Sequence, residues 1–510
     1  MSKLTSKFLT ATALAIASFT GTSLAAQNEL TIAIQLEPPH LDPTSAAAGA
    51  IDSVLYSNVF EGLTRFASDG AIISGLAKSW DISADGTEYT FHLHSGVTFH
   101  DGTAMDAEDV KFSLDRARGE DSTNAQKALF SGITDVSVVD STTVKVNLDQ
   151  ANGSFLFNMA WGDAVIVAPE SIEGIKNNPV GTGAFKFVNW VQGDRIELAR
   201  NGDYWGAAPA LDAATFKFIS DPTAAFAAVM AQDVDVFAGF PAPENLPQFE
   251  ADARFQVLSG STEGETILST NNKMPPLDNV KVRKAIAHAV DKNFIHKALM
   301  QGTANDSRTG IHPDSPFYDG DVANYDLDID KANALLDEAG YPMNGASRFS
   351  LTIDFGWPGV KPQVEYVKAA LKKVGIDVQV RASADFPTWA KRMGEMDFDL
   401  SWDTVFNWGD PVIGVHRTYV SDNIGKGVWS NTQGYSNARV DELLALAAVE
   451  KDGAKRKALY AEFQKIIADE LPVYHTNTLP YHTVYNDKVG NPPLGIWGTS
   501  TPIDMTYLKD

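Results

Sequence analysis

The chain has 510 residues, of which 44% are hydrophobic and 21% are charged, a composition typical of globular proteins with two or three domains. Its 65 Asp and Glu residues outnumber 41 Lys and Arg residues, which gives a formal net charge of -24. So acidic a chain repels phosphate backbones and anionic membranes, and we expect no nucleic-acid partner. The simplest meaning of the acidity is solubility.

The first 25 residues have the features of a bacterial secretory signal peptide. Lys3 and Lys7 form a short positive region, a mostly apolar run extends from Phe8 to Ala17, and Ser23-Leu24-Ala25 offers small residues for cleavage. The apolar run is too short for a retained membrane helix. Because the chain has no cysteine, it has no disulfide and no thiol for a lipid anchor. We therefore expect a freely diffusing periplasmic protein.

Three of the ten histidines, His92, His94 and His100, fall in the stretch YTFHLHSGVTFHDG at residues 89–102. Apolar and polar residues alternate there, which predicts a half-buried hairpin with all three imidazoles on its polar face. His92 and His94 would point the same way on a strand and could share a metal ion. A closed site needs further ligands, so we interpret the three as solvated or hydrogen-bonded. Asp106 is then placed to cap a helix.

The second half of the chain alternates between strand and helix patterns. Phe349–Phe355 and Ile376–Val380 are typical of strands, and between them lies a helical pattern at Val364–Val374 that Gly375 ends. A strand, helix and strand of this length predict a parallel crossover. The other elements predicted here are helices at Asn279–Met300, Thr388–Met393, Val440–Glu450 and Ala454–Asp469 and a strand at Phe398–Thr404.

No motif of a catalytic or cofactor site stands out. The sequence lacks the G-x-S-x-G, H-E-x-x-H, phosphate-loop lysine and paired C-x-x-C patterns. Gly181-Thr182-Gly183 has no third glycine and precedes a strand pattern, so we interpret it as a tight turn. We therefore expect no cofactor. A hydrolase with paired carboxylates stays open only because acidic residues are abundant.

Four segments carry a resemblance, and they run in order across essentially the whole chain after residue 25. They are LAKSWDISADGTEYTFHLHSGVTFHDGTAMDAEDVKFSLDR at Leu76–Arg116, PVGTGAFKFVNWVQGDRIELARNGDYWG at Pro179–Gly206 with DPTAAFAAVMAQDVDV after it, LSTNNKMPPLDNVKVRKAIAHAVDK at Leu268–Lys292, and GYSNARVDELLALA at Gly434–Ala447. Together they resemble the family 5 extracellular solute-binding proteins of ABC importers, the dipeptide- and oligopeptide-binding group.

The resemblance implies an α/β fold of two lobes that close like a clamshell, the type II periplasmic binding protein fold, with an extra subdomain in the first lobe. The first lobe would comprise residues 26–55, 178–265 and 485–510, the subdomain residues 56–177, and the second lobe residues 266–484. The resemblance also implies a monomer that binds a small-molecule or peptide ligand between the lobes. It would deliver this ligand to the membrane permease of an ABC importer and break no bond.

The ligand contacts implied by the resemblance lie in FNWGDP, residues 406–411. In peptide-binding members, an aspartate four residues before a proline pairs with the α-ammonium of the ligand. The matching position here, four before Pro411, is Asn407. An amide is a dipole without net charge, so a free peptide N-terminus is not the obvious ligand. Asp410 could substitute for the missing acid or could stabilise the local turn.

Aromatic residues and an arginine flank this segment. Trp402, Phe406 and Trp408 could stack on a ligand or fill the core beside a strand end. Arg417 could bind a ligand carboxylate or hold a surface acid. The candidate ligand-binding residues are Asn407, Trp408, Asp410, Trp402, Phe406 and Arg417.

Several alternatives stay open for the function. Within the family the ligand could be a peptide, an opine-like conjugate, an oligosaccharide or a nickel complex, the last depending on histidines such as His92 or His416. The alternative outside the family is a secreted hydrolase of sugars or peptides. An enzyme would leave products with turnover, whereas a binding protein returns its ligand unchanged.

Overall fold

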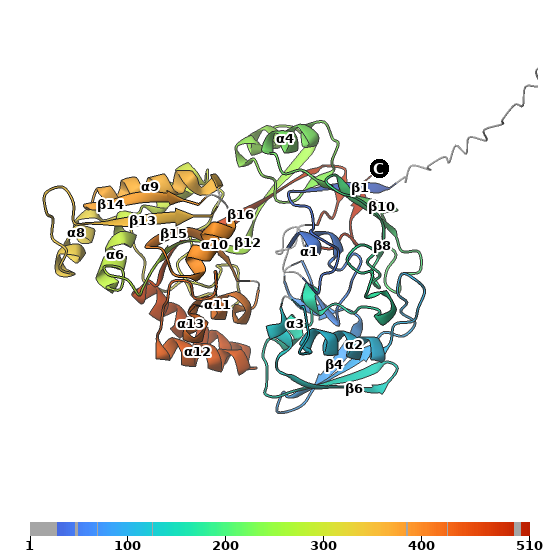
Figure 1. Ribbon diagram of the computed structural model, residues 1–510. Coiled ribbons are helices and arrows are strands. Elements are labelled where there is room, and N and C mark those ends of the chain that lie inside the picture. Colours follow the sequence, from blue (N-terminus) through green and yellow to red (C-terminus); the bar gives the residue numbers. More distant parts are fainter. Residues whose placement is uncertain are drawn as a thin grey trace, which may run out of the picture.

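The computed structural model describes residues 28–45, 49–68, 70–124, 126–356, 358–383, 386–407, 409–425, 427–493 and 501–509. The expected signal peptide and Trp408 lie outside the described residues. Figure 1 shows two lobes joined by two long strands. Within the described ranges, no helix is both long enough and apolar enough to span a bilayer.

The first lobe is built on a mixed sheet whose central strand lies near the start of the described chain. In spatial order its strands are β11 (Val236–Phe237), β1 (Glu29–Ile34), β10 (Ala213–Phe218), β9 (Arg195–Arg200) and β8 (Phe185–Val191). β1 runs parallel to both neighbours, whereas β9 and β8 are antiparallel. Leu30, Ile32 and Ile34 alternate along β1 and share one apolar core with helix α1 (Gly49–Leu55), as the period of two in a strand predicts.

A four-stranded antiparallel sheet forms a subdomain of the first lobe. Its strands are, in order, β4 (Ala77–Ile82), β5 (Glu88–Leu93), β7 (Thr143–Leu148) and β6 (Ile133–Asp140). Helix α2 (Ala107–Arg118) packs on this sheet, and the Asp106 carboxylate caps it as predicted, accepting from the Glu108 N–H at 2.8 Å. The predicted hairpin is wrong in its second arm. β5 pairs with β4 and β7, and residues 97–100 form no strand of this sheet.

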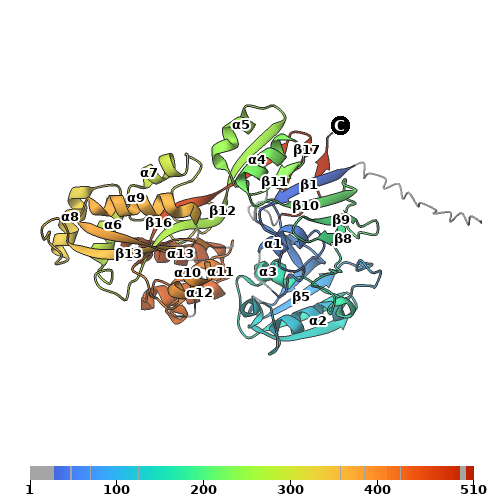
Figure 2. The same ribbon diagram turned by 45° about the horizontal axis from the view of Figure 1, so that its top comes forward.

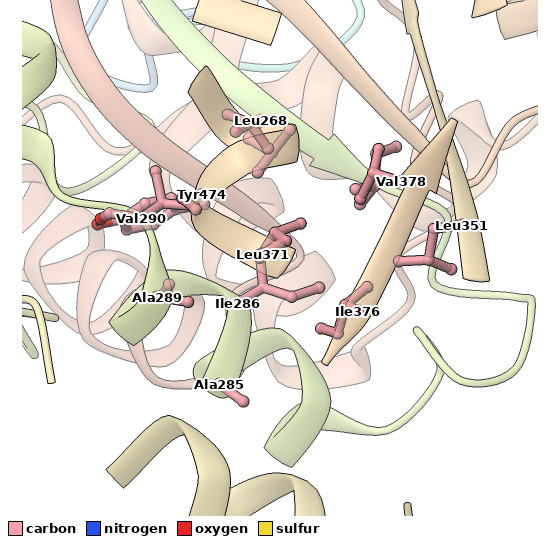
Figure 3. Close-up of a cluster of buried hydrophobic side chains, with 14 of the residues drawn as sticks. Leu268, Ala285, Ile286, Ala289, Val290, Leu351, Leu371, Ile376, Val378 and Tyr474 are labelled. Atoms are coloured by element: carbon pink, nitrogen blue, oxygen red, sulfur yellow. The ribbon is translucent and has the colours of Figure 1, made fainter. Parts of the chain in front are cut away.

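The second lobe contains the predicted parallel crossover. β13 (Phe349–Phe355) and β14 (Ile376–Ala382) are parallel, and α9 (Lys361–Lys372) connects them, which confirms the prediction from periodicity. β15 (Leu400–Phe406) lies parallel on the other side of β13. One face of these strands packs on α9 and on α6 (Val280–Ala289). The core drawn in Figure 3 includes Leu268, Ala285, Ile286, Leu351, Leu371, Ile376 and Val378.

Three helices belong to a second core of the second lobe. They are α11 (Pro411–Tyr419), α12 (Ala438–Val449) and α13 (Gly453–Glu470). The last two confirm the helices predicted near the end of the chain. Val405 of β15 packs among them, whereas Leu400 and Trp402 belong to the first core. β15 is therefore buried on both faces, as expected for a strand in a sheet that helices cover on both sides.

Two long antiparallel strands join the lobes. β12 (Phe255–Thr270) and β16 (Val473–Asn486) pair along most of their length, with a shift in register between Ser261 and Glu265. They unite both lobes in one ten-stranded sheet, ordered β14-β13-β15-β12-β16-β11-β1-β10-β9-β8. The chain returns along β16 to the first lobe, where β16 pairs with β11.

The helix predicted over Asn279–Met300 is divided. α6 ends at Ala289, and the Asp291 carboxylate caps a new turn by accepting from the Asn293 N–H at 2.9 Å. Figure 2 shows α4 and α5 beside the first-lobe ends of β11 and β12. The remaining helices and strands are β2 (Thr64–Phe66), β3 (Ile72–Ser74), α3 (Phe155–Asn158), α4 (Pro222–Met230), α5 (Leu246–Glu250), α7 (Lys292–Phe294), α8 (Ile329–Glu338), α10 (Phe386–Gly394), β17 (Val489–Gly490) and β18 (Tyr507–Leu508).

Candidate ligand-binding site

The carboxyl ends of three second-lobe strands point toward the first lobe. The first residues of β12 pair with the last residues of β16, and this part of β16 also pairs with the first-lobe strand β11. From there β12 runs into the second lobe and ends at Thr270. β15 is antiparallel to β12, so Leu400 lies opposite Thr270 and Phe406 lies opposite Gly264. The end of β15, and the ends of its parallel neighbours β13 and β14, therefore face the first lobe. Ligands of open α/β sheets bind outside this edge.

The turn after β15 lies at this edge and leads into α11. The Asn407 N–H donates to the Glu263 carbonyl at 3.1 Å, and the Asn407 side chain is buried. Its Nδ2 has no hydrogen-bond partner among the described residues. α11 packs very closely here, because a Cβ at Gly414 would lie 2.2 Å from the Phe406 carbonyl oxygen. A buried donor left unpaired is costly, so the Asn407 amide is suited to donate to a ligand.

Asp410 ends this turn and is fully engaged within the second lobe. Its Oδ1 accepts from the Val412 N–H at 3.0 Å and so caps α11. Arg456 of α13 donates to both carboxylate oxygens, at 2.7 and 2.8 Å, and both side chains are buried. The structure therefore favours the turn-stabilising alternative for Asp410, because neither oxygen is free for a ligand.

Arg456 also contacts the first lobe. Its Nη2 donates to the Ser154 Oγ at 3.0 Å, and the Gly153 N–H donates to the Ala448 carbonyl at 3.0 Å. An apolar part of the same contact joins Ile413 of α11 to Tyr56, Phe66, Phe157 and Ala160. The helices α3, α11 and α12, which border this contact, lie below the joining strands in Figure 1. The two lobes are thus held together both by β12 and β16 and by side chains that meet across the space between them.

A hollow of about 200 Å³ adjoins this contact and is lined by both lobes. Phe155 and Asn158 of α3 line it from the first lobe, and Val412 of α11 and Ala448 of α12 line it from the second. Because its two walls come from different lobes, the hollow exists only while the lobes are in contact.

Glu263 of β12 is a site residue that the sequence analysis did not single out. One of its carboxylate oxygens accepts the Gly409 N–H. Its side chain is 8% exposed, and this burial raises its pKa to about 7, with the charges of Asp410, Glu265 and Asp314 adding to the rise. The signal was the pair Glu263 and Glu265, which are two residues apart in a strand-like stretch and would share a face.

The other sequence-predicted residues have different surroundings. Trp402 is 1% exposed in the second-lobe core, which supports its core-packing alternative. Phe406 is half-buried at the end of β15, next to Asn407. Arg417 of α11 has a buried Nε without a hydrogen-bond partner in the described part of the chain. Burial lowers the pKa of Arg417, and the buried Asp403 carboxylate partly opposes this.

Two acids of the first lobe lie near the apolar part of the contact. The Tyr56 N–H, directly after α1, donates to the Asp52 carbonyl at 3.0 Å, so Asp52 lies one helical turn before Tyr56. Burial raises the pKa of Asp52 to about 7. Burial and repulsion from Asp52 raise the pKa of Asp163 to about 8. The first lobe therefore presents acids close to the residues that meet Ile413.

The three histidines of residues 89–102 have separate partners. His92 Nε2 lies 2.9 Å from the Asp81 carboxylate, the His94 ring packs 4.5 Å from the Trp205 ring, and the His100 Nε2–H donates to the Gly183 carbonyl at 2.9 Å. Burial lowers the pKa of His100 to about 4. In the ranges that the structure describes, no group of three His, Cys, Asp or Glu side chains is arranged to hold a metal ion.

Known proteins match this architecture over most of the chain. The family model for bacterial extracellular solute-binding proteins, family 5 (middle part), matches residues 71–426. The glutathione-binding protein GsiB of Pectobacterium atrosepticum is 31% identical over 462 residues, or 87% of each chain. Heme-binding protein A of Haemophilus influenzae is 28% identical over 471 residues, which is 85% of this chain and 84% of the relative.

A solved structure agrees in fold. The ABC transporter-associated periplasmic binding protein DppA from Helicobacter pylori, in complex with the peptide STSA, superposes with a TM-score of 0.81 at 25% identity, over 94% of this chain and 98% of that one. The predicted type II periplasmic binding protein fold, with two α/β lobes, is confirmed by this match.

Proposed function

Because the chain belongs to the bacterial extracellular solute-binding proteins of family 5, we propose that it captures a peptide or peptide-like small solute between its lobes. It then delivers the solute, chemically unchanged, to the membrane permease of an ABC importer. The protein acts as a monomer in the periplasm after removal of residues 1–25, and it uses no cofactor.

The observation that carries the proposal is the contact between the lobes at Arg456 and Ser154, with Ile413 seated in first-lobe residues. A solute that changes such a clamshell from mostly open to mostly closed must favour the closed state by about 5.5 kcal/mol. Contacts with both lobes can supply this energy. The proposed hinge lies in β12 and β16, between a first lobe of residues 26–55, 178–265 and 485–510, with its subdomain of residues 56–177, and a second lobe of residues 266–484.

The proposed site is the turn after β15 together with the facing part of β12. Asn407 donates its free amide, and Phe406 provides aromatic surface beside it. Trp408 follows Asn407 in the sequence and is kept as a candidate from the sequence alone. Arg417 of α11, whose buried Nε has no partner in the described part of the chain, is a second donor for a carboxylate. GsiB is named for glutathione binding, and the DppA structure holds a tetrapeptide. These names support a peptide-like solute as the first class to test, ahead of an opine conjugate, an oligosaccharide or a nickel complex.

Native mass spectrometry of the protein purified from periplasm tests the proposal, together with titration calorimetry using glutathione and the peptide Ser-Thr-Ser-Ala. We expect a bound small solute to be recovered intact and to reduce the radius of gyration in X-ray scattering. Cleaved products that accumulate with turnover would instead support the hydrolase alternative. Identical particle dimensions with and without bound solute would contradict closure.

A further inference from the structure

We propose that Glu263 supplies the negative charge that binds a cationic group of the solute, such as a primary ammonium. The inference rests on the proposed function and names the class of solute that the site takes. It replaces the expectation that Asn407 leaves the site neutral, because the acid stands on β12 and not in the turn that follows β15.

The position of Glu263 is fixed by the turn that it contacts. Its neighbour Gly264 pairs with Phe406, the last residue of β15. The Asn407 N–H donates to the Glu263 carbonyl at 3.1 Å, and the Gly409 N–H donates to its carboxylate. The acid therefore lies beside the residue whose side-chain amide has no partner in the described chain. A full negative charge and a neutral donor are offered together at the edge where ligands of such sheets bind.

Asp410 and Glu265, the two acids whose charges act most on Glu263, each have a basic side chain close by. Arg456 donates to Asp410 through two hydrogen bonds, at 2.7 and 2.8 Å. His475 Nδ1 lies 2.7 Å from the Glu265 carboxylate. No ion pair joins Glu263 to a Lys, Arg or His side chain among the residues that the structure describes. A buried carboxylate without a counter-ion is strongly disfavoured, so a cation on the solute would complete the site.

The alternative is that Glu263 only holds the turn. Its bond from the Gly409 N–H needs an acceptor oxygen but no charge, and the amide oxygen of glutamine supplies one. A counter-ion needs the charge itself. Glu263→Gln separates the two roles, because it keeps the oxygen and removes the charge. The exposed Glu173 of the first lobe gives the matched control, since Glu173→Gln removes one charge away from the site.

The test uses the purified protein and an equimolar library of dipeptides and tripeptides, each present with a free and with an acetylated amino terminus. Native mass spectrometry identifies the retained members, and titration calorimetry measures the dissociation constants of the tightest pair. We expect the free-amine member to bind at least about tenfold more tightly than its acetylated counterpart. Glu263→Gln should abolish this preference, and Glu173→Gln should keep it.

Binding of the free-amine peptide should also strengthen as the pH rises from 6 to 8. The pKa of Glu263 is raised to about 7 by burial, so below that pH its carboxyl must lose a proton before it can pair with an ammonium. The titratable and charged groups that face it are Asp410 with Arg456, Glu265 with His475, and Asp314. Glu263→Gln leaves all of them in place and should lose the pH dependence.

An unchanged preference in Glu263→Gln would overturn the inference, and so would retention of acetylated members alone or of no library member. Capture of a neutral solute from periplasmic extract would still support the proposed transport function, so the two failures are distinguishable. If Glu263→Gln does not fold, Glu263→Asp provides the second variant. It keeps the charge on a shorter side chain and should retain the preference for the free amine.

Discussion

Glu61 in the first lobe and Glu263 between the lobes are both buried glutamates, and burial raises the pKa of each to about 7. Their partners differ. Glu61 accepts hydrogen bonds from the Thr182 hydroxyl, the Tyr204 hydroxyl and the Trp205 N–H, at 2.8, 2.9 and 2.8 Å. Glu263 accepts one main-chain N–H through its carboxylate.

The two glutamates differ in how many protein donors satisfy them. Three donors satisfy the Glu61 carboxylate, whereas the Glu263 carboxylate has room for a donor from a ligand under the proposal above. The Glu61 pocket is closed by the fold itself, since a Cβ at Gly183 would lie 2.3 Å from the Asn58 carbonyl oxygen. Its three donors come from Pro179–Gly206, one of the segments that carry the resemblance to the family. We therefore attribute the resemblance in this segment to a structural role and not to ligand binding. Glu263 is also buried, but its carboxylate accepts only the one main-chain N–H among the described residues. A buried acid is therefore evidence for binding only when the protein itself does not satisfy it.

Arg456→Met should have the largest effect on stability, because it gives Asp410 the same lack of partners as Glu263. Asp410 is buried, and its only cationic partner in the described chain is Arg456. Breaking a buried ion pair from one side costs about 3–5 kcal/mol. Urea unfolding followed by tryptophan fluorescence measures the loss. The double variant Asp410→Asn with Arg456→Met removes both charges and should recover part of it. A stable single variant would show that the pair contributes little.

Glu61→Ala should be the next most damaging change. It leaves the Thr182 and Tyr204 hydroxyls and the Trp205 N–H without their acceptor. A buried donor left unpaired costs about 1–3 kcal/mol. Because Thr182 is buried and Tyr204 and Trp205 are half-buried, we expect a loss of about 3 kcal/mol in the same unfolding assay. Glu61→Gln keeps one acceptor oxygen and should lose less. An equal loss for Glu61→Ala and Glu263→Ala would remove the distinction between the two sites.

The pH dependence of stability sharpens the comparison further. The pKa of Glu263 is raised above its value in an unfolded chain, so its protonated form stabilises the fold at low pH and this contribution is lost as the pH rises through about 7. In Glu263→Gln without ligand, the fall in unfolding free energy between pH 5 and pH 8 should be smaller by roughly 2 kcal/mol. Asp52, Glu61, Asp163 and Asp403 also have raised pKa values, so a fall should remain. An unaltered pH profile would show that Glu263 does not titrate in this range.

Local patterns in the sequence predicted helices and strands. They did not predict contacts between segments that are distant in the sequence. Periodicity located the strands and helix of the crossover at residues 349–380 and the strand before Asn407, whereas the ligand-binding role of Asn407 was implied by the resemblance. It could not show that Glu263 lies against Gly409, which is 146 residues away, or that Asp410 meets Arg456. Alternation indicates which face of a strand is buried but not which segment covers it. The histidine hairpin failed for this reason, because β4 and β7 are the partners of β5.

Ser154→Ala should have the smallest effect, and it tests whether the Glu263 site is completed only when the lobes meet. Ser154 Oγ accepts the hydrogen bond that Arg456 donates to the first lobe, at 3.0 Å. Among the described residues, Ser154 has no hydrogen bond with Asn407 or Glu263. Losing one such bond costs about 0.5–1.5 kcal/mol. Because the bond exists only when the lobes are together, its loss should weaken solute binding by a factor of roughly 2 to 12 and leave the preference for a free amine unchanged. Calorimetry with the matched peptide pair measures both quantities. A change in preference would mean that the contact shapes the site itself, whereas unchanged affinity would mean that the lobes close without it.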